Sequence, residues 1–341
     1  MARYSKKVSM QDIASRLGIS KNAVSLALNN KQGVNEELRK MVFKAAEELN
    51  YGSLGEDRKK SNYILVLIPE YILNDKIFYY EIFWAIEKHT KDHGYHSIVS
   101  SVTKEMEEKL LLPDMFYELN FSGIMIVGVI SKQFIMKLNS IDLPMVLVDN
   151  YYDDLPLNAV VTANIEGAYT IVKHLIDNGH KEIGFIAPIT MTASFYERWC
   201  GYNRAMLEGN LYVDEKYCIT KPSPIEVSLT DSKQIQEFIN TLDKLPTAWF
   251  CGNDRIALTL TGLLLEKGID VPGEVSVAGF DDIEAARLVT PALTTMNVNK
   301  ALLGVKAVDL LLKKIKRNEE KEVVKIFSEL IVRQSVRDLK K

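Results

Sequence analysis

The side chains that follow Ser20 have the types needed to read the edges of DNA bases. Lys21, Asn22, Ser25 and Leu26 would project from the start of a helix that begins after Ser20. Asparagine can pair with adenine, lysine can donate to guanine, and leucine can contact the methyl group of thymine. These residues therefore predict a base-reading surface.

Four further polar side chains are better placed to contact phosphates than bases, and they are Ser9, Gln11, Ser20 and Asn29. Phosphate contacts set the orientation of a protein on DNA, whereas base contacts specify sequence. For each residue of either group, the alternative is a polar side chain that simply faces solvent.

A pair of short helices would position these residues. Ser9 followed by Asp12 predicts a capped helix that runs through Leu17. A tight turn containing Gly18 leads to a second helix, which Ser20 can cap and which ends near Leu28. Two helices joined in this way form a helix-turn-helix, whose second helix enters the major groove of DNA.

A third helix is predicted after Asn35, which can cap it. Apolar residues at helical spacing would close a small core between the three helices: Ile13, Leu17, Val24, Leu28, Leu38, Val42, Ala45, Ala46 and Leu49.

The sequence of this region resembles that of the headpiece of LacI/GalR-type transcriptional regulators. The matching pattern is MxDIAxxLGISxxxVSxALN, followed by GVxEELR and AAEELNY, all within residues 10–51. Members of that family often have arginine where this chain has Leu26. The difference replaces a bidentate guanine contact by an apolar one, so we expect the operator to deviate from the usual half-site.

Residues 52–62, GSLGEDRKKSN, form the predicted linker. Its glycines, serines and charges are typical of a flexible segment. In the family this position usually carries a Pro-Asn and a hinge helix whose leucine wedges into the minor groove. Here the Pro-Asn is missing and Leu54 is the one candidate wedge. Either Leu54 substitutes for the usual leucine, or the protein depends more on its headpiece.

Length and composition suggest a globular protein of two or three domains. The chain has 341 residues, of which 47% are hydrophobic and 26% charged. No apolar run reaches the ~18 residues of a membrane helix, and we see no signal peptide. Three cysteines without CxxC spacing suit free thiols in a reducing compartment. We therefore expect a cytoplasmic protein with no membrane partner.

The charge is distributed unevenly along the chain. Residues 1–60 contain 12 Lys and Arg against 7 Asp and Glu, and the remaining residues contain 30 against 38. A basic head on an acidic body is what a DNA-binding module attached to a non-DNA-binding domain needs. A solvated basic face is the less specific alternative.

From Asn62 onward, short apolar runs alternate with helical patterns. Strands are predicted at 63–68, 96–102, 123–128, 144–149, 158–162, 182–187, 247–250, 274–280, 293–298 and 326–332. Repeated βαβ units imply parallel sheets covered by helices on both faces. About 280 residues are too many for a domain built on a single sheet, so we expect two doubly wound lobes with a ligand between them.

This part also resembles the regulator family. The matching segments include PMVLVDN, HLIDNGHKEIGFIA, NDRIALTLTGLL, VPGEVSVAGFDD and TPALTTMNV, in that order. The resemblance implies an α+β multidomain protein: an all-α helix-turn-helix headpiece followed by two α/β doubly wound, periplasmic-binding-protein-like lobes.

The resemblance also implies a division of the chain. The headpiece takes residues 1–50 and the linker 51–62. The N-terminal lobe takes 63–162 with 292–322, and the C-terminal lobe 163–291 with 323–341. Because no leucine heptad follows the last strand, we expect a homodimer and not a tetramer.

Seven residues fit the effector site that the resemblance implies: Phe78, Tyr79, Asp149, Asn164, Arg198, Asn253 and Asp281. An arginine flanked by carboxylates and amides can clamp several hydroxyls, and aromatic rings can cover the face of a sugar. The alternatives are helix caps for the three residues Asp149, Asn253 and Asp281, an ion pair for Arg198, and core packing for the aromatic residues. Many relatives have Asp-Asn where this chain has Ala163-Asn164, which leaves the identity of the sugar open.

Other chemistries find little support. His89, His93 and His96 approach the spacing of a metal site, but Gly94 breaks the helix before the third, so we expect no metal. No phosphate-binding glycine loop and no recognisable nucleophile context is present, so we expect no cofactor and no enzyme activity.

The leading hypothesis is a homodimeric repressor that binds a near-palindromic operator and responds to a sugar. The ligand acts either as inducer or as corepressor. The rivals are a binding protein for a transported sugar and an enzyme with the same lobes.

Overall fold

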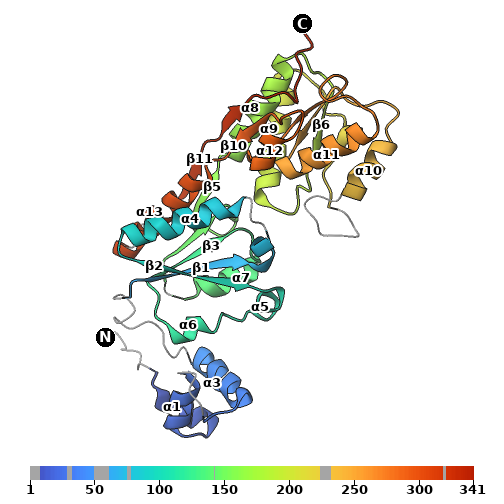
Figure 1. Cartoon of the computed structure of the whole chain (residues 1–341). Coiled ribbons are helices and arrows are strands. Elements are labelled where there is room, and N and C mark those ends of the chain that lie inside the picture. Colours follow the sequence, from blue (N-terminus) through green and yellow to red (C-terminus); the bar gives the residue numbers. More distant parts are fainter. Residues whose placement is uncertain are drawn as a thin grey trace.

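The computed structural model describes residues 8–28, 33–49, 61–74, 78–141, 143–222, 232–317 and 320–341. Figure 1 shows a small helical headpiece, a lobe around β1–β5, and a second lobe that contains β6. The predicted fold class, an all-α headpiece followed by two α/β lobes, is confirmed. No helix in the described ranges is both long enough and apolar enough to cross a bilayer.

Three helices form the headpiece: α1 (Met10–Leu17), α2 (Lys21–Leu28) and α3 (Glu36–Glu48). Each begins at a predicted cap. Asp12 accepts hydrogen bonds from the backbone and hydroxyl of Ser9, at 2.7 and 2.6 Å. The Ser20 hydroxyl accepts from the backbone of Ala23 at 3.0 Å, and the Asn35 side chain accepts from Leu38 at 2.8 Å. The buried core consists of Ile13, Ala14, Val24, Ala27, Val42, Ala45 and Ala46.

The N-terminal lobe is built on a six-stranded sheet of order β11-β5-β4-β3-β1-β2, in which every pair is parallel. Its strands are β1 (Tyr63–Pro69), β2 (His96–Val102), β3 (Gly123–Val127), β4 (Met145–Val148), β5 (Asn158–Thr162) and β11 (Val323–Ile326). Its helices are η2 (Glu70–Asn74), α4 (Tyr79–Asp92), α5 (Lys104–Lys109), α6 (Met115–Glu118), α7 (Lys132–Asn139) and α13 (Lys300–Lys316).

Strand β1 shows why this sheet needs helices on both faces. Ile64, Val66 and Ile68 join the core cluster that contains Ile82 of α4 and residues of α13. The alternate residues, such as Leu65, join the cluster that contains Phe134 of α7. Because successive side chains of a strand point to opposite faces, a continuous apolar run is buried on both sides.

The C-terminal lobe has a four-stranded parallel sheet of order β7-β6-β8-β9. Its strands are β6 (Ile183–Ile186), β7 (Cys218–Ile219), β8 (Ala248–Cys251) and β9 (Ser276–Ala278). Its helices are α8 (Asn164–Asp177), α9 (Ala193–Glu208), η3 (Glu215–Tyr217), α10 (Ser232–Asn240), α11 (Asp254–Glu266) and α12 (Glu284–Leu288). At Gly201 of α9, a side chain would overlap the backbone of Ile165 in α8, so glycine permits the close packing of these two helices.

The last predicted strand, 326–332, overlaps two short strands in different sheets: the last residue of β11 and the whole of β12. β11 pairs in parallel with β5 in the N-terminal lobe. β12 (Glu329–Ile331) pairs antiparallel with β10 (Thr295–Asn297) in a separate ribbon. Sequence patterning could not separate them because both are short and only two residues lie between them.

These pairings also move two of the predicted crossings between the lobes. Residues 294 and 297 form bridges with Ala278 and Asp281 of the C-terminal lobe, so the chain crosses after β10 instead of near 291. Because β11 belongs to the sheet of the N-terminal lobe, the last crossing follows Ile326 instead of 322.

Candidate functional site

The predicted base-reading residues lie on the face of α2 that points away from the headpiece core. Val24 and Ala27 are buried against α1 and α3. Lys21 and Asn22 are exposed, whereas Ser25 and Leu26 are half-buried. At 100° per residue, positions 21, 22, 25 and 26 share one side of the helix. The face therefore has the geometry of a recognition helix, with two exposed polar donors at its start.

The predicted phosphate-contacting residues gather around the N-termini of the first two helices. Ser9 caps α1, Gln11 is exposed in the first turn of α1, and Ser20 caps α2. Helix N-termini favour anions, which suits contacts with a phosphate backbone. Asn29 and Leu54 lie outside the described residues, as does most of the predicted linker.

Arg198 is the centre of a polar cluster between the lobes, and it is 4% exposed. Its Nε donates to Asn164 Oδ1 at 2.9 Å and its Nη1 donates to the carbonyl of Gly252 at 2.6 Å. Its Nη2 forms an ion pair with Asp281 at 3.1 Å. The guanidinium also lies 3.8 Å from the ring centroid of Phe280. The arginine is therefore held by three polar partners and one aromatic face.

Glu197 extends this cluster toward the N-terminal lobe. It accepts from Asn164 Nδ2 at 2.9 Å and from the hydroxyl of Tyr151 at 2.9 Å. Lys325 of β11 approaches the same carboxylate at 3.4 Å. Tyr151 and Lys325 belong to the N-terminal lobe and to the crossing strand, so Glu197 joins the two lobes.

The predicted effector residues of the N-terminal lobe, Phe78, Tyr79 and Asp149, lie next to one another. The Tyr79 hydroxyl donates to Asp149 Oδ2 at 3.0 Å. Phe78 is buried beside Tyr79, with ring centroids 5.0 Å apart, and the Lys300 ammonium lies 5.6 Å from the Phe78 centroid. We call Tyr79, Asp149, Asn164, Glu197, Arg198 and Asp281 the interlobe cluster.

Asn253 has the role that the alternative interpretation gave it. Its side chain caps α11 by accepting from the backbone of Ile256 at 2.9 Å. It follows Gly252, whose carbonyl holds Arg198. Asn253 thus shapes the edge of the cluster, and its oxygen is already used inside the protein.

The electrostatics of the cluster favour a neutral Asp149. Burial raises the pKa of Asp149 to about 7; the nearby Arg198 charge opposes the shift, while the Asp281 charge adds to it. Asp254, which begins α11, is buried as well, and burial followed by the Asp281 charge raises its pKa to about 8. A carboxyl group that is neutral near pH 7 can donate a hydrogen bond as well as accept one.

Backbone strain coincides with this cluster. Asp149, Asp281 and Asp282 have φ values of 62°, 113° and 48°, in the region that non-glycine residues rarely adopt. Such conformations cost on the order of 1–3 kcal/mol each and concentrate at ligand-binding sites. Asp282 is held by Arg333 at 2.6 Å and by Arg287 at 2.8 Å. Lys300 donates a hydrogen bond to the Asp281 carbonyl at 2.7 Å, so two ion pairs and this hydrogen bond hold the strained segment in place.

Sequence reasoning missed five residues of this site: Glu197, Tyr151, Phe280, Lys300 and Lys325. Glu197 was within reach of sequence reasoning because it directly precedes Arg198 in the chain. Lys300 and Lys325 come from segments more than a hundred residues along the chain, and no local pattern marks them.

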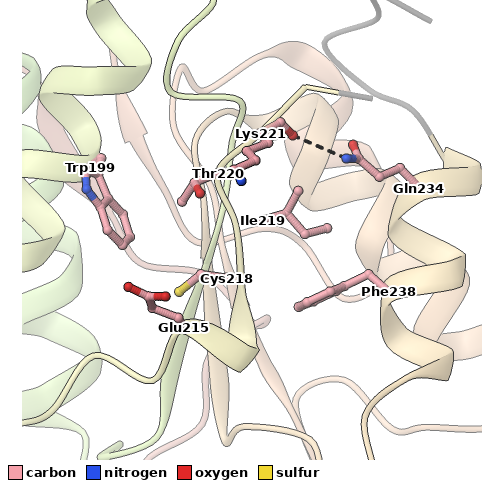
Figure 2. A pocket seen from close by; sticks show the side chains of 8 residues that line it. All are labelled: Trp199, Glu215, Cys218, Ile219, Thr220, Lys221, Gln234 and Phe238. Carbon is pink, nitrogen blue, oxygen red and sulfur yellow. Dashed lines mark hydrogen bonds between the residues drawn. The ribbon is translucent and has the colours of Figure 1, made fainter. Parts of the chain in front are cut away.

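A separate hollow of about 510 Å³ lies on the C-terminal lobe, between α9, β7 and α10 (Figure 2). Trp199, Cys218 and Phe238 line it together with five further residues. Burial raises the pKa of the Cys218 thiol to about 11, which makes it a poor nucleophile. None of the predicted effector residues lines this hollow, so it is distinct from the interlobe cluster.

Comparison with known proteins covers both parts of the chain. The model of bacterial regulatory proteins of the lacI family matches residues 9–53. The model of the periplasmic binding protein-like domain matches residues 172–336. The transcriptional repressor PurR of Actinobacillus pleuropneumoniae serotype 3 (strain JL03) is 32% identical over 342 residues, covering 97% of this chain and 99% of the relative. PurR of Pasteurella multocida (strain Pm70) is 32% identical over 337 residues, covering 96% and 98%.

Solved structures show the same fold. The regulator CelR in complex with cellobiose aligns with a TM-score of 0.72 at 21% identity, covering 96% of this chain and 99% of that one. The lac repressor dimer bound to operator and the anti-inducer ONPF aligns at 0.69 and 24%, covering 97% and 100%. A lacI-family regulator from Enterococcus faecium with bound ribose aligns at 0.67 and 25%, covering 81% and 99%.

Proposed function

Because the chain belongs to the lacI family of bacterial regulatory proteins and is a DNA-binding transcriptional repressor of that family, we propose that a sugar-type effector binds at the interlobe cluster and controls its affinity for a near-palindromic operator. The observation that carries the proposal is the fixed guanidinium of Arg198, held between Asn164, Gly252 and Asp281. A planar donor fixed beside carboxylates suits neighbouring hydroxyl groups.

The chemistry of the cluster supports a polyhydroxylated ligand. Arg198 offers only donors, Glu197 offers acceptors, and Asp149 can do both when it is neutral. Phe280 is fully buried and stacks on the guanidinium, so it fixes the orientation of Arg198. Two structural neighbours bear a sugar in their titles, cellobiose in one and ribose in the other, which is consistent with this chemistry.

The residues on α2 and the twofold symmetry of a dimer support binding to a near-palindromic operator. Lys21, Asn22, Ser25 and Leu26 would contact base edges, while Ser9, Gln11 and Ser20 would contact phosphates. Two headpieces on a symmetric dimer would require a near-palindromic site. We also propose the division of the chain into domains. The headpiece takes residues 1–50 and the linker 51–62. The two lobes follow, and the chain crosses between them after β10 and again after β11.

Exposed apolar residues on the N-terminal lobe support a homodimer. Tyr80 and Trp84 of α4 are each 56% exposed, and Val99 of the edge strand β2 is 50% exposed. The two aromatic rings contact each other edge to face, with centroids 6.0 Å apart. Apolar patches of this kind are typical of protein interfaces. We therefore assign this surface to contact with a second copy.

A two-step experiment tests the proposal. A thermal-shift screen of the full chain against sugars, with cellobiose and ribose included, should reveal a ligand that raises the melting temperature, because a ligand that binds the native state stabilises it. A mobility-shift titration with the DNA upstream of its own gene then measures operator binding with and without that sugar. If no panel member stabilises the protein while operator binding persists, the sugar effector is wrong and the repressor function stands.

A further inference from the structure

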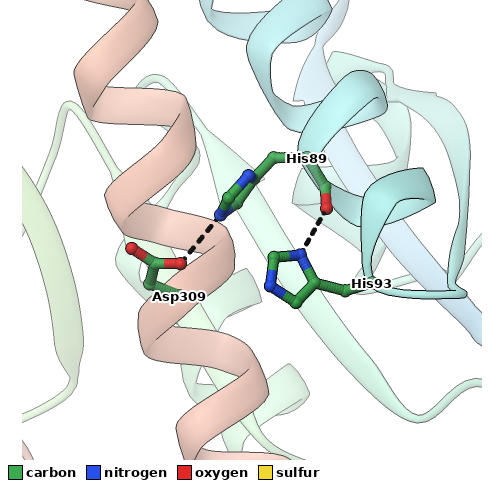
Figure 3. A group of neighbouring side chains, drawn as sticks. All are labelled: His89, His93 and Asp309. Atoms are coloured by element: carbon green, nitrogen blue, oxygen red, sulfur yellow. Dashed lines mark hydrogen bonds and ion pairs between the residues drawn. The ribbon is translucent and has the colours of Figure 1, made fainter.

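A group of metal-ligand side chains lies between α4 and α13, away from both sites described above (Figure 3). His89 and His93 stand four residues apart at the end of α4, and Asp309 comes from α13. One nitrogen or oxygen of each residue lies within 4.8 Å of the others. The sequence led us to expect no metal here because Gly94 breaks the helix before His96, and the ring of His96 indeed lies against that of Tyr63, with centroids 6.0 Å apart. Asp309, more than two hundred residues from His89, is the third member of the group instead.

One hydrogen bond orients His93 as a metal ligand. His93 Nδ1 lies 2.8 Å from the backbone carbonyl of His89. A carbonyl only accepts, so Nδ1 carries the proton and the lone pair is on Nε2. Metal-bound histidines usually donate their other ring N–H to a carbonyl or carboxylate in this way. His93 is therefore held in the tautomer that binds a metal.

His89 already faces the third ligand. Its Nε2 donates to Asp309 Oδ1 at 2.8 Å. With a metal bound, the neutral His89 ring would carry its proton on Nδ1, which leaves the lone pair of Nε2 and Asp309 Oδ1 free to bind the ion. Lys306 competes for the other carboxylate oxygen from 3.5 Å, but it is 46% exposed and can turn into solvent.

Close helix packing fixes the spacing of the ligands. At Gly304 of α13, a side-chain carbon would lie 2.7 Å from the carbonyl of Ile82 in α4, so only glycine allows the helices to approach this closely. Ile82 and Ile86 of α4 are buried in the same apolar cluster as Leu303 and Ala307 of α13. Rigid elements hold a metal site more accurately than loops do. The side chain of His89 is 23% exposed and that of Asp309 43%, which leaves the group open to an ion from solvent.

We propose that His89, His93 and Asp309 form a binding site for a divalent transition-metal ion, with Zn²⁺ as the best match. Two imidazoles and one carboxylate suit zinc and its neighbours, whereas magnesium and calcium prefer oxygen ligands alone. Water would complete the coordination at the exposed side. The ion would tie together two helices whose first turns carry Tyr79 and Lys300, at the interlobe region. The site does not depend on the proposed effector.

Zinc binding to the full chain tests the proposal. The protein is first stripped of metal with a chelator, and Zn²⁺ is then titrated in competition with a chromophoric chelator. We expect one ion per chain, and we expect His93→Gln and Asp309→Asn each to weaken binding by at least about tenfold. His96→Gln is the matched control, because it removes an exposed histidine nearby without touching the group, and it should bind zinc as the unchanged protein does.

Two further measurements make the result decisive. Circular dichroism of each variant without metal should show an unchanged fold, so that lost binding reflects lost ligands. Cys200→Ser should leave the affinity unchanged, because the free thiol of Cys200 is outside the group. The proposal is wrong if the chain binds no zinc, if His93→Gln binds it as tightly as the unchanged protein, or if binding depends on Cys200.

Discussion

Buried Asp254 makes the stability of the C-terminal lobe sensitive to pH. Asp254 accepts hydrogen bonds from the Thr295 hydroxyl at 2.5 Å and from the backbone of Ile283 at 2.9 Å. Burial nevertheless dominates and raises the pKa to about 8. Its ordinary pKa in the unfolded chain is near 3.9. The folded protein therefore binds a proton more tightly than the unfolded chain does.

The sign of the pH dependence follows from this difference. Stability contributed by the protonated carboxyl is complete below about pH 4 and is lost as the pH rises through about 8. We predict that the free energy of unfolding falls between about pH 5 and about pH 8. Asp254→Asn should remove a share of this fall on the order of a few kcal/mol. Chemical denaturation at several pH values measures it. Asp243→Asn, at an exposed surface position, is the control, and equal slopes in the two variants would contradict the account.

We expect Leu26 to give this protein an operator preference different from that of relatives with arginine at this position. Leu26→Arg should shift preference toward a guanine at one position of each half-site, by about 1–3 kcal/mol. Selection of binding sites from a randomised DNA pool measures the preference. Met41→Arg adds the same charge at an exposed position of α3 and should raise affinity for all sequences alike. The same base preference in both variants would rule out base reading by position 26.

Among the secondary-structure elements, the helix caps contribute to the stability of the headpiece. Asn35 accepts from the backbone of Leu38 and begins α3, whose Val42, Ala45 and Ala46 close the core. Asn35→Ala should destabilise the headpiece by about 0.5–2 kcal/mol, whereas Asn35→Asp keeps the cap. Hydrogen exchange of residues 33–49 should speed up in the alanine variant only, with β1 unchanged. Unchanged exchange in Asn35→Ala would show that packing alone sets the stability of the headpiece.

The same elements show which features the sequence can predict. The caps at Ser9, Ser20 and Asn35 depend on neighbours three residues away, so a local pattern is enough. The parallel sheets follow from alternating apolar runs and helices. The division of 326–332 between two sheets depends on partners more than thirty residues away in sequence. For the same reason, Lys300 beside Asp281 and Asp309 beside His89 became visible only in the folded chain.

At the scale of the whole molecule, the exposed patch on α4 should join two copies. Trp84→Glu places a charge within the proposed dimer surface and should shift the protein toward monomer, because a buried charge is costly. Light scattering after gel filtration measures the mass. Tyr212→Glu changes a residue that is 83% exposed on the other lobe and should leave the mass unchanged. A dimer that persists in Trp84→Glu would place the interface elsewhere.

At the level of the whole molecule, the interlobe cluster can couple an effector to the DNA-binding headpiece. Tyr151 and Lys325 contact Glu197 across the lobes, so a ligand that rearranges this cluster also changes how the lobes meet. Coupling energies of about 1–3 kcal/mol change affinity by roughly 5- to 150-fold. Such a change is enough to switch an operator between occupied and free.

Operator affinity measured by fluorescence anisotropy, with and without the sugar found by thermal shift, tests whether the interlobe cluster and the headpiece are coupled. In the unchanged protein the sugar should change the Kd by roughly 5- to 150-fold. In Arg198→Lys, which keeps the charge but loses the planar contacts, it should change the Kd little. Arg204→Lys, on the exposed side of α9, is the matched control and should respond in full. An equal response in Arg198→Lys, or none in the unchanged protein, would contradict the account.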